Sequence, residues 1–294
     1  MDAERDPAAG ALEVRQRRGA WWEVHRRIFA RWIADAAAGV PPGLGLKTDL
    51  FDEASGEHHV WQELPSGWTF IGIDIDVGVV RKARVRLAAE GRQAHCAVAD
   101  VRALPFPRSS ISSILSLSTL DHLGTRNDIA LALREFERTL IRGGRLLLTL
   151  DNPRNPEVAL RALLPRFVVQ HLRADTFALG VTVSQREGTR MLRALGFQVL
   201  QTAYAEHAPR YVAIRAIAWL TQINARLAAR WLARLVAACE GFRATPLAPW
   251  SGHYTVWIAS AAQSLDRDSP EDAEEGEPRE AATQPANAGA RSTA

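Results

Sequence analysis

The sequence is poor in cysteine and has no long apolar run. Among its 294 residues only Cys96 and Cys239 are cysteines, so we expect neither a disulfide framework nor a cysteine-based metal site. No apolar run reaches the roughly 18 residues that a membrane-spanning helix requires. The first ten residues, MDAERDPAAG, are charged and lack the apolar centre of a secretion signal. These absences favour a soluble, cytoplasmic protein.

Lysine is also nearly absent, because 36 basic residues include only Lys47 and Lys82 and the rest are arginines. The formal net charge of +3 is spread unevenly: residues 264–294 hold eight acids and three arginines, which leaves +8 on the rest of the chain. The arginines are scattered rather than gathered in a stripe, so a compositional bias explains them better than a nucleic-acid surface. The phosphate-loop motif G-x-x-x-x-G-K-[ST] is missing as well. We therefore expect no nucleic-acid partner and no nucleotide-triphosphate enzyme.

The sequence pattern of residues 11–263 is typical of one α/β domain. Hydrophobic residues make up 47% of the chain, enough to bury a sizeable core. Short, unbroken apolar runs separate helical stretches, which is typical of a parallel sheet covered by helices on both faces. Strands are predicted at LGLKTDLF, 68–75, 94–99, 112–118, 145–150, 197–204 and 253–261, and helices at 77–90, 127–141 and 187–195. The prediction is thus a seven-stranded, mostly parallel sheet.

The two ends of the chain and two of its helices are predicted to differ from the α/β pattern. Residues 1–10 are predicted to be a flexible leader, and the polar, acidic residues 264–294 a disordered tail. Two helices, 11–38 and 209–239, are basic, apolar and rich in tryptophan, and such helices can lie on an anionic membrane surface. A lid that packs over the sheet and covers a substrate pocket is the commoner arrangement and is our interpretation. Weak contact with a membrane surface is the alternative.

Acidic residues follow three successive predicted strands: Asp49, Asp74 and Asp100. Ligands of open parallel sheets bind beyond the carboxyl ends of the strands. Carboxylates there can accept the hydroxyls of a ribose or the amino group of an adenine, and can face a cationic group. The set therefore suits a positively charged nucleoside without phosphates. Two simpler roles stay open, namely Asp74 as the N-cap of the next helix and Asp100 as a turn residue.

Three segments carry a resemblance to a known family: FIGIDIDVGVVRKAR, AHCAVADVRALPFPRSSISSILSLSTLDHL and LREFERTLIRGGRLLLTL. Over roughly residues 44–204 the chain resembles class I S-adenosylmethionine-dependent methyltransferases, in particular the type 11 group. The resemblance implies a Rossmann-like α/β fold, S-adenosylmethionine as the cofactor, and a structural turn at Arg142-Gly143-Gly144. The cofactor residues that it implies are Asp74 and Ile75 at the ribose, Asp100 and Val101 at the adenine, and Ser116 and Ser118 along the cofactor.

The first loop departs from the family's pattern. Where the family has acid-x-Gly-x-Gly-x-Gly, this chain has LGLKTDLFDEASGEHH, and only Gly56 remains after Asp49. Glycine lets a backbone approach a ligand closely, so this loop must hold the methionine end of the cofactor differently. Thr48, Asp49 and Asp52 are the candidates. The loss also supports an alternative function, a catalytically inactive methyltransferase-like partner or membrane-surface adaptor.

Candidate residues for the methyl acceptor follow the later strands. Histidine titrates near neutral pH, so His122 is the predicted general base. Candidates for substrate contact are Asp121, Asn152, His207 and Arg210. Capping or loop-bracing roles remain open for His122 and for these residues. No metal is expected, because the adjacent His58 and His59 lack ligand spacing. The predicted reaction is methyl transfer to a small molecule, hydrophobic or aromatic because the lid helices are rich in tryptophan and leucine.

Overall fold

The structure is a computed structural model that describes residues 7–55, 60–92, 94–164 and 180–261. The chain divides into two units, Met1–Gln263 and Ser264–Ala294. The predicted acidic tail and residues 1–6 of the predicted leader lie outside the described residues. Helix α1 spans Pro7–Ala37, so it begins inside the segment predicted to be a leader. Proline suits the start of a helix, because its fixed φ is already helical and it needs no N–H partner there.

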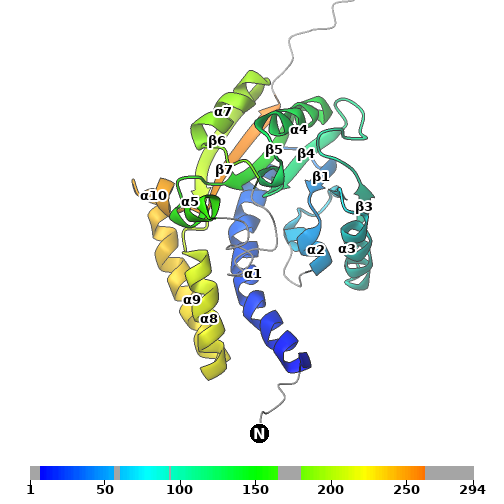
Figure 1. The fold of residues 1–294 in the computed structure, drawn as a ribbon. Helices are drawn as coiled ribbons and strands as arrows, with labels where there is room; N and C mark the ends of the chain where they lie inside the picture. The colour runs from blue at the N-terminus through cyan, green and yellow to red at the C-terminus, as the bar shows by residue number, and fades with distance from the viewer. Residues whose placement is uncertain (1–6, 56–59, 93, 165–179, 262–294) are drawn as a thin grey trace, which may run out of the picture. The chain divides into compact units, whose positions relative to one another are not determined.

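Within the described residues seven strands form one sheet, in the order β3-β2-β1-β4-β5-β7-β6 (Figure 1). Strands β3, β2, β1, β4 and β5 run parallel, whereas β7 is antiparallel to both β5 and β6. The predicted seven-stranded, mostly parallel sheet is therefore confirmed. The strand bounds are β1 Leu44–Thr48, β2 Thr69–Asp74, β3 His95–Val98, β4 Ile111–Leu117, β5 Leu140–Asp151, β6 Phe197–Ala205 and β7 Tyr254–Ala261.

The connection order reverses between β1 and β4, which are neighbours in the sheet. In sheets of this kind a ligand crevice opens at that point, beyond the carboxyl ends of the strands. The shorter helical elements near these ends are α2 Phe51–Ser55, η1 Val60–Glu63, η2 Leu120–His122, α5 Pro156–Leu163, η3 Gly241–Ala244 and α10 Ala248–Ser251. The predicted acidic residues thus lie at the carboxyl ends of neighbouring parallel strands.

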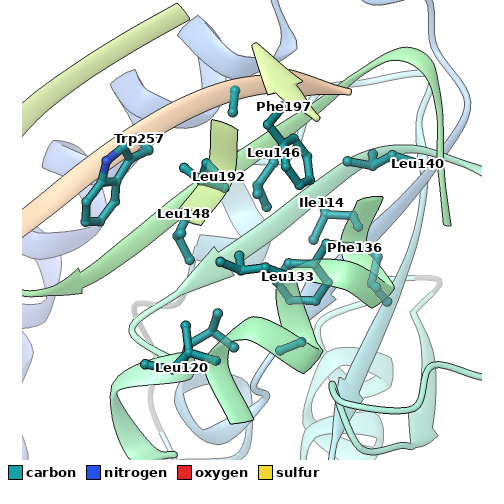
Figure 2. Packing of buried hydrophobic residues seen from close by; sticks show 14 of the residues in the cluster. Ile114, Leu120, Leu133, Phe136, Leu140, Leu146, Leu148, Leu192, Phe197 and Trp257 are labelled. Atoms are coloured by element: carbon teal, nitrogen blue, oxygen red, sulfur yellow. The ribbon is translucent and has the colours of Figure 1, made fainter. Parts of the chain in front are cut away.

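Helices cover both faces of the sheet. On one face α4 (Arg126–Thr139) and α7 (Gln185–Ala194) pack on the strands, and on the other face α1 and α3 (Val77–Ala89) do so. The two cores alternate along β5, because successive strand residues point to opposite sides: Leu146 and Leu148 belong to the first core and Leu147 to the second. Figure 2 shows the first core, in which Leu133 and Phe136 of α4 lie beside strand residues.

Close packing of α7 on β7 requires a glycine. A Cβ at Gly188 would come within 2.6 Å of the ring of Trp257, a fully buried side chain. The Trp257 indole N–H donates to the hydroxyl of Thr189 (3.0 Å), so the ring has both its packing and its polar partner on the same helix.

Two predicted elements differ in detail. Arg142-Gly143-Gly144, predicted to be a turn, lies inside β5, where Gly143 takes a φ of 75° and the register with β4 shifts. Glycine permits such a strand irregularity, which explains the misprediction. The predicted helix 209–239 is two helices, α8 (Arg210–Ile223) and α9 (Ala225–Glu240). The break falls at Asn224, whose side chain accepts a hydrogen bond from the Leu227 N–H and caps α9.

Helix α1 belongs to two cores. Its residues Phe29, Trp32 and Ile33 pack on the sheet, whereas Trp21 joins a third core with residues of α8 and α9. Among the described helices none is long and apolar enough to cross a membrane.

Candidate active site

A pocket opens at the carboxyl ends of β1, β4 and β5, where a parallel sheet is expected to bind its ligand. Residues of these strand ends and the loops after them form its floor, and α1, α5, α8 and β7 contribute its walls. The lining residues are His25, Phe29, Lys47, Asp49, Phe51, Asp52, Val60, Leu117, Ser118, His122, Asp151, Arg161, Arg210 and Tyr254. The two helices predicted to form a lid thus supply His25, Phe29 and Arg210 to the wall.

The turn after β1 holds Asp49 in the left-handed region of backbone conformation, with a φ of 67°. Aspartate tolerates this region better than most side chains, and its Oδ1 accepts a hydrogen bond from the Phe51 N–H (2.7 Å) at the start of α2. Burial raises the pKa of Asp49 to about 7. The cation of Lys47 opposes that rise, and the neighbouring acids Asp52 and Asp74 add to it. A cation that arrived beside Asp49 would favour its ionised form.

A buried ion pair lies beneath the same loop. Lys47 Nζ is 2.9 Å from Glu53 Oε2 and 2.5 Å from the Asp49 carbonyl oxygen, and both charged side chains are almost fully buried. Burial lowers the pKa of Lys47, but the carboxylates of Glu53, Asp49 and Asp52 outweigh it, so the pKa is raised overall. Lys47 therefore stays protonated and fixes a loop that lacks the family's glycines.

Asp74, at the end of β2, ties that strand to the first loop. Its Oδ2 accepts the Leu50 N–H (3.0 Å) and its Oδ1 accepts the Asp76 N–H (2.9 Å). The N-cap of α3 is Asp76, whose side chain accepts from the N–H groups of Gly78 and Val79. The alternative role of Asp74 as the N-cap is therefore wrong. The neighbouring Ile75 is exposed.

Asp100, after β3, already has a cationic partner. Arg102 Nη2 lies 2.7 Å from Asp100 Oδ2, and the Arg102 N–H donates to Oδ1 (2.8 Å), which is the turn role left open above. Arg102 also pairs with Asp128. The Arg102 side-chain hydrogen bonds hold the pKa of Asp100 below its usual range. Val101 packs against the first core. An adenine contact at Asp100 stays a prediction, and it requires the carboxylate to share or exchange this arginine.

The predicted cofactor residues near β4 separate into two groups. Thr48 and Ser116 are fully buried, so their side chains do not line the pocket; the Thr48 hydroxyl lies 2.7 Å from that of Thr119. Ser118 does line it, with a φ of 53° and a hydroxyl that donates to Asp121 Oδ2 (2.8 Å). Gly56 lies outside the described residues.

Three residues predicted to contact the acceptor are instead buried and bonded to the protein. Asp121 accepts from Ser118 and from the Asp151 N–H. The Asn152 amide donates to two carbonyl oxygens beside α10, and His207 bonds the Ser251 hydroxyl and the Tyr204 carbonyl. Within the described residues these side chains do not line the pocket. They satisfy buried backbone N–H and carbonyl groups of the neighbouring loops and so hold those loops in place.

The other two predicted acceptor-side residues do line the pocket. His122 lies exposed in η2. Arg210 begins α8 and donates to the Tyr254 hydroxyl (2.9 Å), while its N–H donates to Glu157 (3.0 Å). The pocket also holds an ion pair that the sequence did not suggest, Arg161 with Asp151 at the end of β5 (2.5 Å).

Sequence reasoning missed a buried histidine–carboxylate pair in the wall. His25 Nδ1, on α1, lies 2.6 Å from Glu206 Oε2, after β6. Burial would raise the pKa of Glu206, but His25, Arg210 and His253 lower it to about 2, so the carboxylate is ionised. Glu206 has a φ of 60°, and its Oε1 accepts no hydrogen bond from the described residues. The only signal was that Glu206 stands in EHAPR, because 181 residues separate the pair.

Among the described residues no group of histidine, cysteine, aspartate and glutamate side chains is placed to hold a metal ion. The candidate site therefore consists of carboxylates at strand ends, two histidines, two arginines and an aromatic wall.

Comparisons with known proteins agree with this geometry. Residues 52–148 match the family model described as a methyltransferase domain. No curated protein matches the chain. Similar solved structures include the [4+2]-cyclase SpnF (17% identity, 80% of each chain, TM-score 0.53). A geranyl diphosphate methyltransferase in complex with S-adenosylmethionine is 18% identical over 88% of this chain and 93% of its own, with a TM-score of 0.51. A protein from Galdieria sulphuraria inferred to be a sarcosine dimethylglycine methyltransferase is 11% identical over 80% and 85%, also with a TM-score of 0.51.

These structural likenesses show a shared fold, and one of the three proteins is named as a cyclase, so the fold alone does not fix a reaction. The family match is the finding that bears on the reaction class: residues 52–148, about a third of the chain, match a methyltransferase domain.

Proposed function

We propose that the protein transfers the methyl group of S-adenosylmethionine to a small hydrophobic or aromatic acceptor. One observation carries the proposal: a single pocket joins a carboxylate-bearing strand edge, at Asp49 and Asp52, to an apolar wall that contains Phe29 and Tyr254. The first part suits a cationic donor and the second an apolar acceptor.

The acidic set fits the cofactor. Asp49 and Asp52 can attract cationic groups, and Asp74 stands at the next strand end with both oxygens bonded to backbone N–H groups. A carboxylate oxygen can accept more than one hydrogen bond, so Asp74 retains capacity for ribose hydroxyls. The exposed Ile75 offers an apolar surface beside it. When bound, S-adenosylmethionine supplies a methyl group on a cationic sulfur for in-line displacement.

The protein's part in such a reaction is alignment and exclusion of water. Phe29 of α1 packs edge-to-face against Tyr254 of β7, with ring centroids 5.7 Å apart. The pocket walls formed by α1 and by β7 therefore share one aromatic surface. Val60 and Leu117 extend it. We infer that an apolar acceptor lies against this surface, with its nucleophile directed at the strand ends.

An oxygen or nitrogen acceptor must also lose a proton. His122 is one candidate base, and it lines the pocket from an exposed position. His25 is a second candidate, because it lines the pocket and the buried carboxylate of Glu206, 2.6 Å from its Nδ1, holds the imidazole ring in place. Glu206 then acts as a positioning residue.

The second candidate function is an inactive methyltransferase-like partner or adaptor. Two observations favour it: the first loop lacks the family's glycines, and Asp100 is already engaged by Arg102. Neither blocks the pocket at Asp49.

Titration calorimetry of the full chain with S-adenosylmethionine separates the two functions. We expect binding, and we expect Asp74→Ala to weaken it at least tenfold, since it removes the proposed ribose acceptor. Asp35→Ala, an exposed carboxylate on α1, is the control and should bind normally. Absence of any heat with millimolar cofactor, for a folded protein, would leave the inactive partner as the function. Methyl-labelled cofactor with a panel of aromatic and aliphatic acceptors then identifies the acceptor class.

A further inference from the structure

The hairpin of α8 and α9 has an apolar face that the described residues leave open. The two helices lie side by side and are yellow in Figure 1. Asn224 separates them in the chain. Their inner faces pack on each other and on Trp21 of α1. On the other side Val212, Trp219 and Ile223 are each more than 60% exposed.

These exposed residues form one face. Val212, Trp219 and Ile223 are spaced by seven and four residues, which places them on one side of α8. Leu227, 51% exposed, follows in the first turn of α9. We call these four residues the hairpin face. An exposed tryptophan and three exposed aliphatic residues on two consecutive helices are more than the scattered apolar residues of an ordinary surface.

The charge of the hairpin is mostly positive. Helices α8 and α9 contain five arginines and one acid, Glu240 at the end of α9, which accepts the His207 N–H. Arg210 lines the pocket, and the other four arginines, Arg215, Arg226, Arg230 and Arg234, are exposed. The hairpin therefore combines an apolar face with an excess of exposed arginines.

We propose that the hairpin face docks on the surface of an anionic lipid bilayer. Tryptophan and aliphatic side chains can enter the boundary between headgroups and acyl chains, while arginine side chains reach the phosphates. Each arginine near an anionic membrane surface adds to the attraction, and α8 and α9 hold five arginines against one acid.

Other occupants match this surface less well. A second copy related by two-fold symmetry would bring arginines against arginines, with Glu240 as the one acid of α8 and α9 to set against five arginines. The acidic segment 264–294 could neutralise the arginines, but Leu265 is its only large apolar residue, so it cannot cover four apolar side chains. A nucleic acid would likewise leave Val212, Ile223 and Leu227 uncovered.

The proposal is independent of the methyltransferase function, because vesicle binding requires neither cofactor nor acceptor. The experiment is cosedimentation of the full chain with vesicles of phosphatidylcholine alone or with 30% phosphatidylglycerol. We expect binding at least tenfold tighter to the anionic vesicles, weakened by added salt.

Matched variants separate the hairpin from the rest of the surface. Trp219→Ser with Ile223→Ser should weaken binding at least tenfold, whereas Trp250→Ser, which removes another exposed tryptophan in α10, should not. Arg226→Gln with Arg230→Gln should weaken binding to anionic vesicles about tenfold, on the basis that each arginine contributes separately. The control for it is Arg190→Gln with Arg193→Gln, on the exposed side of α7. All these positions are exposed, so the variants should fold, as circular dichroism can verify.

Three results would overturn the proposal. The first is no binding of the wild type to anionic vesicles, and the second is an equal loss in the hairpin and control variants. The third comes from analytical ultracentrifugation: a dimer that Trp219→Ser with Ile223→Ser converts to a monomer would make the hairpin face a contact between two copies of the chain.

Discussion

The buried carboxyl of Asp49 should make cofactor affinity depend on pH. Burial raises its pKa to about 7 in the free protein, so near neutral pH the group is partly protonated. S-adenosylmethionine bears positive charge, and binding beside Asp49 therefore favours the ionised form. Below the pKa, binding must first remove a proton, and affinity falls by up to about tenfold per pH unit.

The magnitude follows from the ionised fraction. With a pKa of about 7, roughly three quarters of Asp49 is ionised at pH 7.5 and roughly one thirtieth at pH 5.5, so the dissociation constant should rise by about 25-fold. The sign for stability is separate: a carboxyl whose folded pKa is raised makes the folded state bind more protons. Its contribution to stability is therefore full at low pH and declines as pH rises from about 4 towards 7.

Titration calorimetry at several pH values, in buffers of different ionisation enthalpy, measures both the affinity and the protons released. Asp49→Asn should bind more weakly at pH 7.5 and should lose most of the pH dependence, since an amide does not titrate. Asp35→Asn, exposed on α1, should keep the wild-type profile. If Asp49→Asn shows the same 25-fold change as the wild type, another group carries the pH dependence and the reasoning about Asp49 fails.

Further predictions concern the two buried ion pairs and are read by urea denaturation. Glu53→Leu leaves the Lys47 ammonium buried without its partner and should cost about 3–5 kcal/mol, while the double variant with Lys47→Met should recover most of that loss. Equal instability of the single and double variants would contradict this. Glu206→Gln should cost about 1–3 kcal/mol at pH 7, because a charge-assisted hydrogen bond to His25 becomes a neutral one. The folded pKa of Glu206 is about 2, so its contribution to stability is present above about pH 4.5 and is lost as pH falls towards 2. The free energy of unfolding of the variant should therefore fall less steeply than that of the wild type below pH 4.5. An equally steep fall in both proteins would refute the ionised Glu206.

The sheet was predictable because its central parallel strands β1 and β4 are almost wholly buried and short apolar runs mark the parallel strands. Asp74 and Asp100 could be placed at strand ends for the same reason, since they stand where those runs end, and their contacts with a cofactor stay predictions. The break at Asn224 had a signal in the polar residues of TQIN, but the apolar residues on both sides hid it.

Contacts that join distant segments had no such signal. His207 was predicted to contact a substrate, whereas Glu206 was not predicted as a site residue. The two are adjacent in the sequence, yet His207 braces a loop and Glu206 is the partner of His25. Which of two adjacent polar side chains reaches His25 depends on backbone conformation, and Glu206 has a left-handed one that no pattern in the sequence predicts. The same holds for Lys47, whose burial with Glu53 depends on how the short helix α2 folds back.

Left-handed backbone at non-glycine residues connects these observations. Four described residues other than glycine have positive φ, and three of them, Asp49, Ser118 and Glu206, follow the strands β1, β4 and β6 around the pocket. Such conformations cost about 1–3 kcal/mol each and persist only where surrounding structure enforces them. Glycine would relieve the strain at any of the three, yet the chain places a carboxyl, a hydroxyl and a carboxylate there. Asp49 faces the pocket, Ser118 faces it and bonds Asp121, and Glu206 orients His25. Residues that served only to turn the chain would not require these side chains, so the distribution of strain supports the strand ends as the site of chemistry even though the glycine-rich loop is absent.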